Sequence, residues 1–247
     1  MIPIKSEADV ENLKISGKIL AKIMRILKSF IRPGISTGQI NSLAEELVYK
    51  ENALPAFKGY KGYPACACTS VNEEIVHGIP GGRLLKEGDI LSLDLGINYK
   101  GYFSDAAFTA AIGRVSPEIN KLIYVTENAL VEGIKKARPE NKLYAISHSI
   151  QSYVERNGFS VVRQFVGHGI GLELHEEPEI PNFGLPDSGP AIKSGMVFAI
   201  EPMVNMGTWE SEILDNGWTA VTKDRLPSAH FEHTVAITEK GPEILTL

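Results

Sequence analysis

The chain carries KEGDILSLD at residues 86–94 and repeats the same plan as KSGMVFAIE at residues 193–201. Each stretch opens with a polar, glycine-containing turn, continues as an apolar run typical of a buried strand, and ends on a carboxylate, Asp94 or Glu201. Burying a carboxylate there is costly unless it is paired or bound to a metal. Taken alone, each residue also fits a strand-end carboxylate that faces solvent or pairs with an arginine.

Two further features recur in the same order in both halves of the chain. A second carboxylate opens another apolar strand, Asp105 after Ser104 and Glu232 after Phe231. A His-Gly pair comes earlier, in VHGI at residues 76–79 and GHGI at residues 167–170. The ordered match predicts a duplicated half-domain with a pseudo-twofold axis through a shared site. The four carboxylates would then converge, and like charges cannot share a buried pocket without a strong cation.

Helical patterns precede the strands in each half. Apolar residues recur with a 3.6 period over residues 6–30 and 37–51, and again over residues 116–134 and 143–156. Ser6 with Asp9 and Ser116 with Pro117 are typical helix starts. No linker separates the halves, so we expect one α+β domain over residues 1–247, with half-repeats of about 1–113 and 114–247.

Composition excludes several classes of protein. The chain has 25 Lys and Arg against 30 Asp and Glu, a net charge of −5, so we expect no direct nucleic-acid site. The longest apolar run, residues 196–200, is too short for a membrane span. Acidic residues among the first eleven argue against a signal peptide. Cys66 and Cys68 lie two apart, on one face of a predicted strand, where they cannot bridge each other. We therefore expect a reduced, cytoplasmic protein.

The carboxylates and one histidine suit a divalent-metal site. Four carboxylates could neutralise two divalent ions, and a nitrogen from His168 favours Mn, Fe, Co or Zn over Ca. Two ions can share a bridging hydroxide, the nucleophile of many hydrolases. His175 follows His168 by seven residues and is a candidate donor to an oxyanion, although a lone histidine is more often a packing or surface residue.

The combined motifs resemble those of type I methionine aminopeptidases. Asp94, Asp105, His168, Glu201 and Glu232 follow one another at spacings of 11, 63, 33 and 31 residues, like the five metal ligands of that family. The same resemblance extends to GYKGYP at residues 59–64, VNEEIVHGIP at 71–80, GHGIG at 167–171, IEPM at 200–203 and FEHT at 231–234. The 33-residue step from His168 to Glu201 is too short for the helical insertion of the type II enzymes. The resemblance covers nearly the whole chain and implies the pita-bread fold, an antiparallel sheet covered by helices.

The resemblance also implies roles for individual residues. Asp94 would bind one metal ion, His168 and Glu201 the other, and Asp105 and Glu232 would bridge both. Glu201 would take and return the proton, His175 would stabilise the scissile carbonyl oxygen, and His77 would lie near the scissile nitrogen.

A methionine pocket is implied as well. Its lining would include Tyr60, Tyr63, Cys68 and Trp218, although from the residues alone these side chains fit simple packing equally well. Three residues depart from the family pattern: Phe57 stands where cysteine is common, Leu174 where phenylalanine is common, and His230 where glutamine is common. These departures concern the shape of the pocket.

The implied activity is removal of N-terminal methionine from peptides and nascent chains when the second residue is small. We expect a monomer, and a transient ribosome contact stays open. Three alternatives remain: a prolidase or aminopeptidase P, which usually has an extra N-terminal domain; a metal-free creatinase-like enzyme, which should lack the ligand set; and an inactive binding module, which tends to have lost ligands.

Overall fold

The computed structural model describes all of residues 1–247. The first half contains α1 (Glu7–Phe30), α2 (Thr37–Lys50), β1 (Leu54–Pro55), a 3-10 turn (Tyr60–Gly62), β2 (Cys68–Val71), β3 (Glu74–Val76), β4 (Ile90–Tyr99) and β5 (Tyr102–Ala111). The second half contains α3 (Pro117–Lys136), α4 (Tyr144–Arg156), β6 (Ser160–Val161), β7 (Gly167–Gly169), β8 (Glu176–Ile180), β9 (Val197–Ile200), β10 (Met203–Asn205), β11 (Ser211–Ile213), β12 (Ala220–Thr222), β13 (Ser228–His230), β14 (Glu232–Thr238) and β15 (Gly241–Ile244). The predicted alternation of helices and strands is confirmed in both halves.

Local hydrogen bonds explain where the helices begin. At α1, the Asp9 amide donates to the Ser6 hydroxyl at 3.2 Å and the Ser6 amide donates to the Asp9 carboxylate at 3.0 Å, which is the expected capping box. Ser116 caps α3 by accepting from the Ile119 amide, with Pro117 in the first turn. The predicted helix starts at Ser6 and Ser116 are therefore confirmed.

The main sheet runs through the centre of the molecule in the order β1-β4-β5-β14-β9-β7-β8, with β2 paired to β4 and β15 paired to β14. Every pairing in it is antiparallel. Strands β5 and β14 lie at the middle of this order, and each has a strand of its own half, β4 or β9, on its outer side. The central four strands, β4-β5-β14-β9, are therefore arranged symmetrically about the β5–β14 pair.

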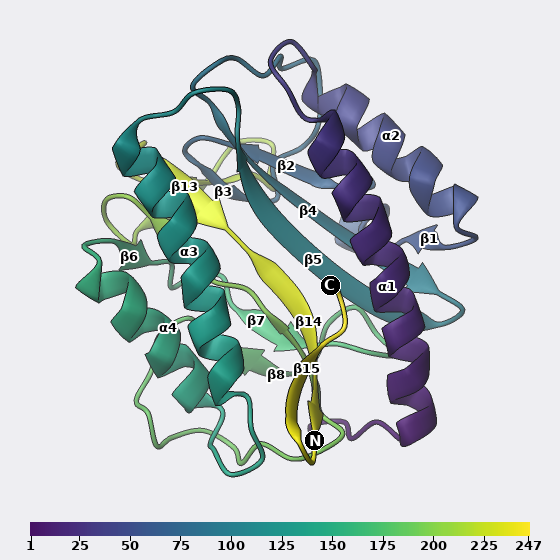
Figure 1. The fold of residues 1–247 in the computed structure, drawn as a ribbon. Helices are drawn as coiled ribbons and strands as arrows, with labels where there is room; N and C mark the ends of the chain where they lie inside the picture. The colour runs from purple at the N-terminus through teal and green to yellow at the C-terminus, as the bar shows by residue number, and fades with distance from the viewer.

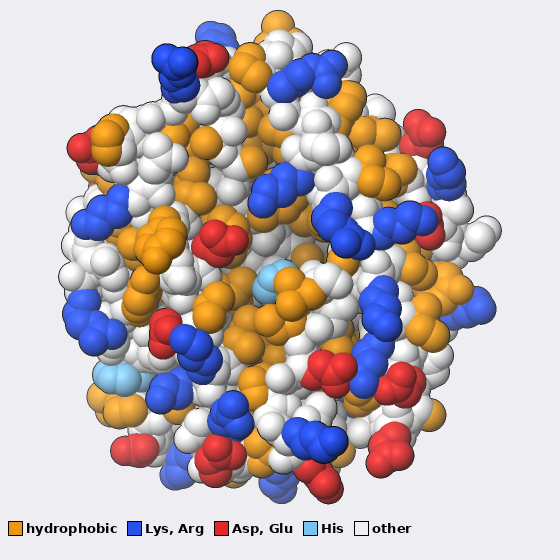
Figure 2. Space-filling view, viewed as in Figure 1, with side chains coloured by type: hydrophobic (Ala, Val, Ile, Leu, Met, Phe, Trp, Pro, Cys, Tyr) orange, Lys and Arg blue, Asp and Glu red, His pale blue; other side chains and the backbone are white.

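All four helices lie on the face of the sheet that is turned toward the viewer in Figure 1. Apolar residues of the helices and the strands form one large core between these layers, which includes Leu20, Leu27, Leu91 and Phe198. A smaller buried cluster, which includes Phe57, Tyr63 and Leu174, lies apart from that core and borders the candidate site. The outer surface of the helix layer mixes basic and acidic side chains (Figure 2).

The expected fold class, an α+β pita-bread fold with an antiparallel sheet covered by helices, is confirmed by this arrangement. The half-repeat boundaries near residue 113 stay a prediction. One detail is wrong: Cys66 lies before β2 rather than on it, so only Cys68 is part of a strand, and both thiols are free and buried. No helix of the structure combines the length and the apolar character needed to cross a bilayer.

Candidate metal centre

Four neighbouring strands bring the four predicted carboxylates together. In the register of the sheet, Asp94 on β4 lies opposite Ala107 on β5, and Ala107 lies opposite Glu232 at the start of β14. Asp105 is two residues before Ala107, so its side chain projects from the same face of β5. Glu201 follows β9, whose last residue Ile200 pairs with His233 of β14. The convergence that the repeat predicted is therefore present.

His168 approaches this cluster from β7, which pairs with β9. Its Nδ1 lies 2.9 Å from the carbonyl oxygen of Gly169, a contact in which the ring nitrogen donates. That bond leaves the Nε2 lone pair facing the Glu201 carboxylate, 3.5 Å from Oε1. Burial lowers the pKa of His168 to about 4, so the ring is neutral at physiological pH. A neutral imidazole with one nitrogen fixed by a backbone carbonyl is a metal-ligand arrangement.

The carboxylates themselves lack any neutralising side chain. None of the four forms an ion pair with a lysine or arginine, and Asp94 Oδ1 and Glu232 Oε1 are buried without a hydrogen-bond partner. Burial, and after it the charge of the neighbouring carboxylates, raises the pKa of Asp94 and of Glu232 well above its usual value. Burial raises the pKa of Asp105 to about 7.

These observations test whether a divalent ion fits. Ligand atoms of Asp105, His168 and Glu232 lie within 4.8 Å of one another. Hard oxygen ligands, a neutral nitrogen ligand and uncompensated negative charge are the donor set that a first-row divalent ion requires. The residues present therefore fit a metal centre.

A cavity of about 290 Å³ opens onto the cluster. Fourteen residues line it, and thirteen of them are the residues that the sequence singled out as ligands, catalytic groups or pocket walls: Phe57, Tyr60, Tyr63, Cys68, His77, Asp94, Asp105, His168, Leu174, His175, Glu201, Trp218 and Glu232. The remaining one is Lys61. The structure thus brings the whole predicted set to one place, while the role of each residue stays a prediction.

The wall away from the carboxylates is apolar and aromatic. Phe57 packs on Gly96, where an added Cβ would lie 2.6 Å from the ring atom Cε1. Tyr63 meets Trp218 edge to face, with ring centroids 5.1 Å apart, and its hydroxyl donates to the carbonyl oxygens of Ala67 and Gly78. Because the Tyr63 hydroxyl is satisfied elsewhere, this end of the cavity offers few polar groups to a ligand.

His175 lies at the mouth of the cavity. Its ring stacks on Tyr60, with centroids 5.0 Å apart and 22° between the planes, and lies 4.2 Å from the ring of His168. Partial burial, and after it the proximity of His168, lowers the pKa of His175. No protein group forms a hydrogen bond with the ring, so its N–H is free to donate to a ligand.

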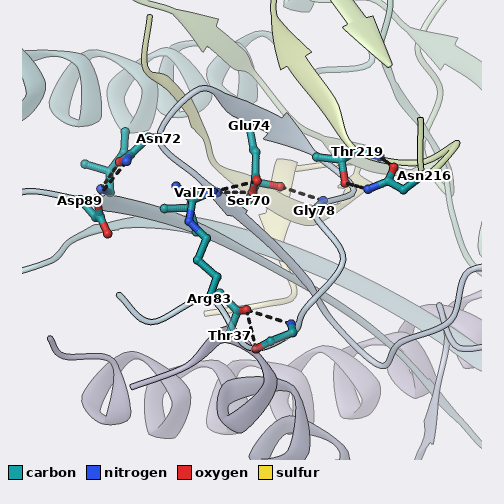
Figure 3. Close-up of polar contacts among 12 residues, drawn as sticks. Thr37, Ser70, Val71, Asn72, Glu74, Gly78, Arg83, Asp89, Asn216 and Thr219 are labelled. Atoms are coloured by element: carbon teal, nitrogen blue, oxygen red, sulfur yellow. Dashed lines mark hydrogen bonds and ion pairs between the residues drawn. The ribbon is translucent and has the colours of Figure 1, made fainter. Parts of the chain in front are cut away.

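His77 directly follows β3 and has a left-handed conformation, with φ 60°. The backbone around it is fixed: the Gly78 amide donates to the Ser70 hydroxyl at 3.1 Å, and Asn216 bonds Thr219, whose hydroxyl lies 3.5 Å from the His77 carbonyl (Figure 3). Its ring meets Phe165 and Trp218 edge to face. Burial lowers the pKa of His77.

The predicted match between His77 and His168 is wrong. His168 lies opposite Ala199 of β9, and the residue at the corresponding place in the other half is Ser70, which lies opposite Ser92 of β4. His77 instead follows β3, which pairs with β12 in a separate sheet. The two His-Gly phrases are therefore similar in sequence but do not occupy equivalent positions in the two halves of the fold.

Two residues near the site had no predicted role in it, although His230 was expected to affect the shape of the pocket; His230 does not line the cavity. His230 on β13 is buried, and its Nε2 lies 3.6 Å from Glu201 Oε2; its position two residues before Glu232 was the available signal. Lys61 has a ring-facing contact with Tyr60, at 5.4 Å from the centroid, and lies between two predicted pocket residues in the chain.

Comparisons with known proteins agree with this geometry. The model of metallopeptidase family M24 matches residues 11–239. The chain is 53% identical over 247 residues to a methionine aminopeptidase of Clostridium perfringens, a match that covers 100% of this chain and 99% of the relative. The crystal structure of methionine aminopeptidase from Rickettsia prowazekii superposes with a TM-score of 0.99, at 39% identity and with 100% of both chains covered.

A prolidase structure gives a useful contrast. The prolidase from Pyrococcus horikoshii is 21% identical, with a TM-score of 0.81. The match covers 99% of this chain but 63% of the prolidase. This likeness extends to the fold alone.

Proposed function

The chain belongs to metallopeptidase family M24, and we propose that it removes the N-terminal methionine from peptides and nascent chains whose second residue is small. The observation that carries the proposal is one cavity with two unlike ends. One end gathers four carboxylates without a basic partner, and the other is an apolar pocket of aromatic side chains. The full-length similarity to methionine aminopeptidases supports the same activity.

Two divalent ions would be held by the converging side chains. Asp94 would bind the first ion, His168 and Glu201 the second, and Asp105 and Glu232 would lie between them. Such ions supply a polarised substrate carbonyl and a nucleophile at neutral pH. The mixed oxygen and nitrogen donor set suits Co, Mn, Fe or Zn.

Three side chains would contact the substrate or transfer its protons. His175, neutral and free to donate, would give its N–H to the scissile carbonyl oxygen as negative charge develops. Glu201, whose pKa burial raises well above the usual value, would accept a proton at its carboxylate and return it to the leaving amine. His77 would lie beside the scissile nitrogen and the second residue.

The pocket accounts for the choice of side chain. Phe57, Tyr63, Cys68 and Trp218 form an apolar wall that fits an unbranched thioether and excludes charge. A bulky second residue would meet His77 and push the carbonyl out of reach, and a misplacement near 1 Å can cost about 100-fold in rate. Leu174, shorter than the phenylalanine common in the family, leaves more room at the rim, so we expect some turnover when the second residue is Val or Thr.

The cellular setting belongs to the proposal as well. We expect the protein to act in the cytoplasm as a monomer on nascent chains, with at most a transient contact at the ribosome.

Metal-stripped protein tests the proposed function. Chelator-treated protein should be inactive, and Co, Mn, Fe or Zn added in turn should restore release of methionine from Met-Ala peptides. Met-Leu peptides should be poor substrates, with a kcat/KM lower by about 100-fold. Equal rates on Met-Ala and Met-Leu, or faster release of lysine or proline than of methionine, would contradict the proposed selectivity. Full activity without metal would contradict the metal mechanism, and no activity with any ion would favour a binding module.

A further inference from the structure

The loop that contains His175 forms no hydrogen bond with the His175 ring. Residues 170–175 connect β7 to β8 and place Leu174 and His175 at the cavity. The His175 ring forms no hydrogen bond with the protein, and its aromatic neighbours are Tyr60 and His168. Its position therefore depends on the shape of the loop backbone.

Glu176, the first residue of β8, binds the backbone of this loop through its carboxylate. One carboxylate oxygen, Oε1, accepts from the amides of Leu172 at 2.8 Å and of Glu173 at 3.2 Å. The other oxygen, Oε2, pairs with the ammonium group of Lys5, 171 residues away in the chain. The two side chains are 4% and 8% exposed, which makes this the most deeply buried Lys–Glu pair of the protein. The loop is thus closed around a carboxylate whose charge is balanced by one lysine.

Lys5 is itself anchored to the main sheet. Its backbone amide donates to the Gly195 carbonyl at 2.7 Å, and the Gly195 amide donates to Ile237 of β14 at 2.9 Å. The segment before α1 therefore passes close to the β14–β15 hairpin (Figure 1). A path of contacts runs from β14, the strand of Glu232, through Lys5 to the loop of His175.

Two glycines leave the space that this path occupies. A Cβ at Gly171 would overlap the aliphatic stem of Lys5. A Cβ at Gly195 would lie 2.7 Å from Ile4 Cγ2 and 2.8 Å from the Lys5 carbonyl oxygen. The loop and the turn before β9 are both shaped to admit the lysine segment, which a chance surface contact does not require.

We propose that Lys5 is a positioning residue for the peptidase reaction: through Glu176 it holds the 170–175 loop so that His175 meets the scissile carbonyl. The inference rests on the proposed role of His175. Without the ammonium group, Glu176 would keep a buried charge with no cation, a state that drives such groups toward water or toward protonation. Movement of the carboxylate toward water releases the Leu172 and Glu173 amides, and protonation weakens both hydrogen bonds; each change loosens the loop and displaces the His175 ring.

A double-mutant cycle tests the proposal. Lys5→Met should lower kcat for a Met-Ala peptide by about 10- to 100-fold, the loss expected for a misplacement of up to about 1 Å. KM should change much less, because Phe57, Tyr63, Cys68 and Trp218 of the pocket wall lie outside the displaced loop. In a His175→Ala background, Lys5→Met should cause no further loss, since the group that it positions is absent.

The control is Lys22→Met. Lys22 forms an ion pair with Glu51 at 2.6 Å, but it is 56% exposed and distant from the cavity loop, so its loss should leave kcat unchanged in both backgrounds. An equal fold-loss from Lys5→Met in both backgrounds would overturn the positioning role in favour of a purely structural one.

Amide hydrogen exchange gives a readout that needs no activity. In Lys5→Met the amides of Leu172 and Glu173 should exchange faster, while metal content by elemental analysis stays that of the unmodified protein. Unchanged exchange at these amides would refute the loop anchor. If exchange at these amides is faster in Lys5→Met but the unmodified, metal-loaded protein releases no methionine, the loop anchor is upheld and the proposed function is rejected.

A milder variant covers the case in which Lys5→Met folds poorly. Glu176→Gln keeps an acceptor oxygen for the two amides but loses the charge that pairs with Lys5. It should show a smaller loss of kcat than Lys5→Met and the same insensitivity in the His175→Ala background. A loss that persists there would again reject positioning.

Discussion

The metal-free protein should become more stable when Asp105, one of the proposed metal ligands, is neutralised. Asp105 is 4% exposed, and burial raises its pKa from 3.8 to about 7. A carboxyl whose folded pKa exceeds its unfolded pKa binds more protons in the native state between those values, so stability falls as pH rises from about 4 to about 7. At about 1.4 kcal/mol per pH unit, that interval amounts to about 4 kcal/mol lost from the free energy of unfolding by pH 8.

Asp105→Asn removes the ionisation and keeps the shape. The amide oxygen can still accept from the Ala106 amide, as Oδ1 does now at 3.0 Å. We therefore expect chelator-treated Asp105→Asn to unfold on the order of 10 °C above the unmodified protein at pH 8. At pH 5 the carboxyl is already protonated in the native state, so the advantage should shrink to about 2 kcal/mol.

Thermal unfolding followed by circular dichroism measures the stability difference between the variant and the unmodified protein at pH 8 and at pH 5. Saturating divalent metal should reverse the order, because the unmodified protein gains binding free energy and the variant has lost a ligand. The control is Asp89→Asn, which removes an acceptor of the Asn72 side chain and the Lys86 amide; it should lower the melting temperature at both pH values. A metal-free Asp105→Asn protein that melts at or below the unmodified protein at pH 8 would refute the reasoning.

Three further substitutions address the ligands, the donor and the pocket. Glu232→Ala should lose at least one metal ion and nearly all activity, and two ions per chain by elemental analysis would overturn its bridging role. His175→Ala should lower kcat by about 10²- to 10³-fold with metal content unchanged, whereas a large loss of metal would make His175 a ligand. Gly96→Ala should push the Phe57 ring into the cavity and raise KM for Met-Ala, because an added Cβ lies 2.6 Å from the ring. Phe57→Cys in the same chain should restore KM, and an unchanged KM for Gly96→Ala would show that the ring yields without narrowing the pocket.

The local features of the fold were readable because they depend on short stretches of chain. Ser6 with Asp9 and Ser116 with Pro117 mark the helix starts by hydrogen bonds that span three residues. The strand-end carboxylates stand out because an acid in an apolar run needs a partner. The pocket residues were found through the family resemblance, since Tyr63 or Trp218 alone fits ordinary packing.

The features that were missed depend on tertiary contacts. His77 and His168 share a phrase, but register and sheet membership separate them, and neither property is visible in four residues. The Lys5–Glu176 pair joins positions 171 apart, and the only local signs were two glycines whose function is to leave room. His230 on β13 lies opposite Met203 of β10, two residues after Glu201, and this register brings its ring close to the Glu201 carboxylate. The pairing of β13 with β10 cannot be read from the spacing of residues in the sequence.

The position of β14 in the middle of the main sheet has a consequence for protein synthesis. The polypeptide is made from its N-terminus, so Asp94 and Asp105 on β4 and β5 emerge long before Glu232. Until β14 inserts between β5 and β9, the sheet has two open edges and the cavity has no second wall. We therefore expect a partly synthesised chain to present these two acidic groups open to water, and to bind divalent metal only after β14 has paired with β5 and β9. On this expectation, peptidase activity begins only when the C-terminal part of the chain has closed the sheet.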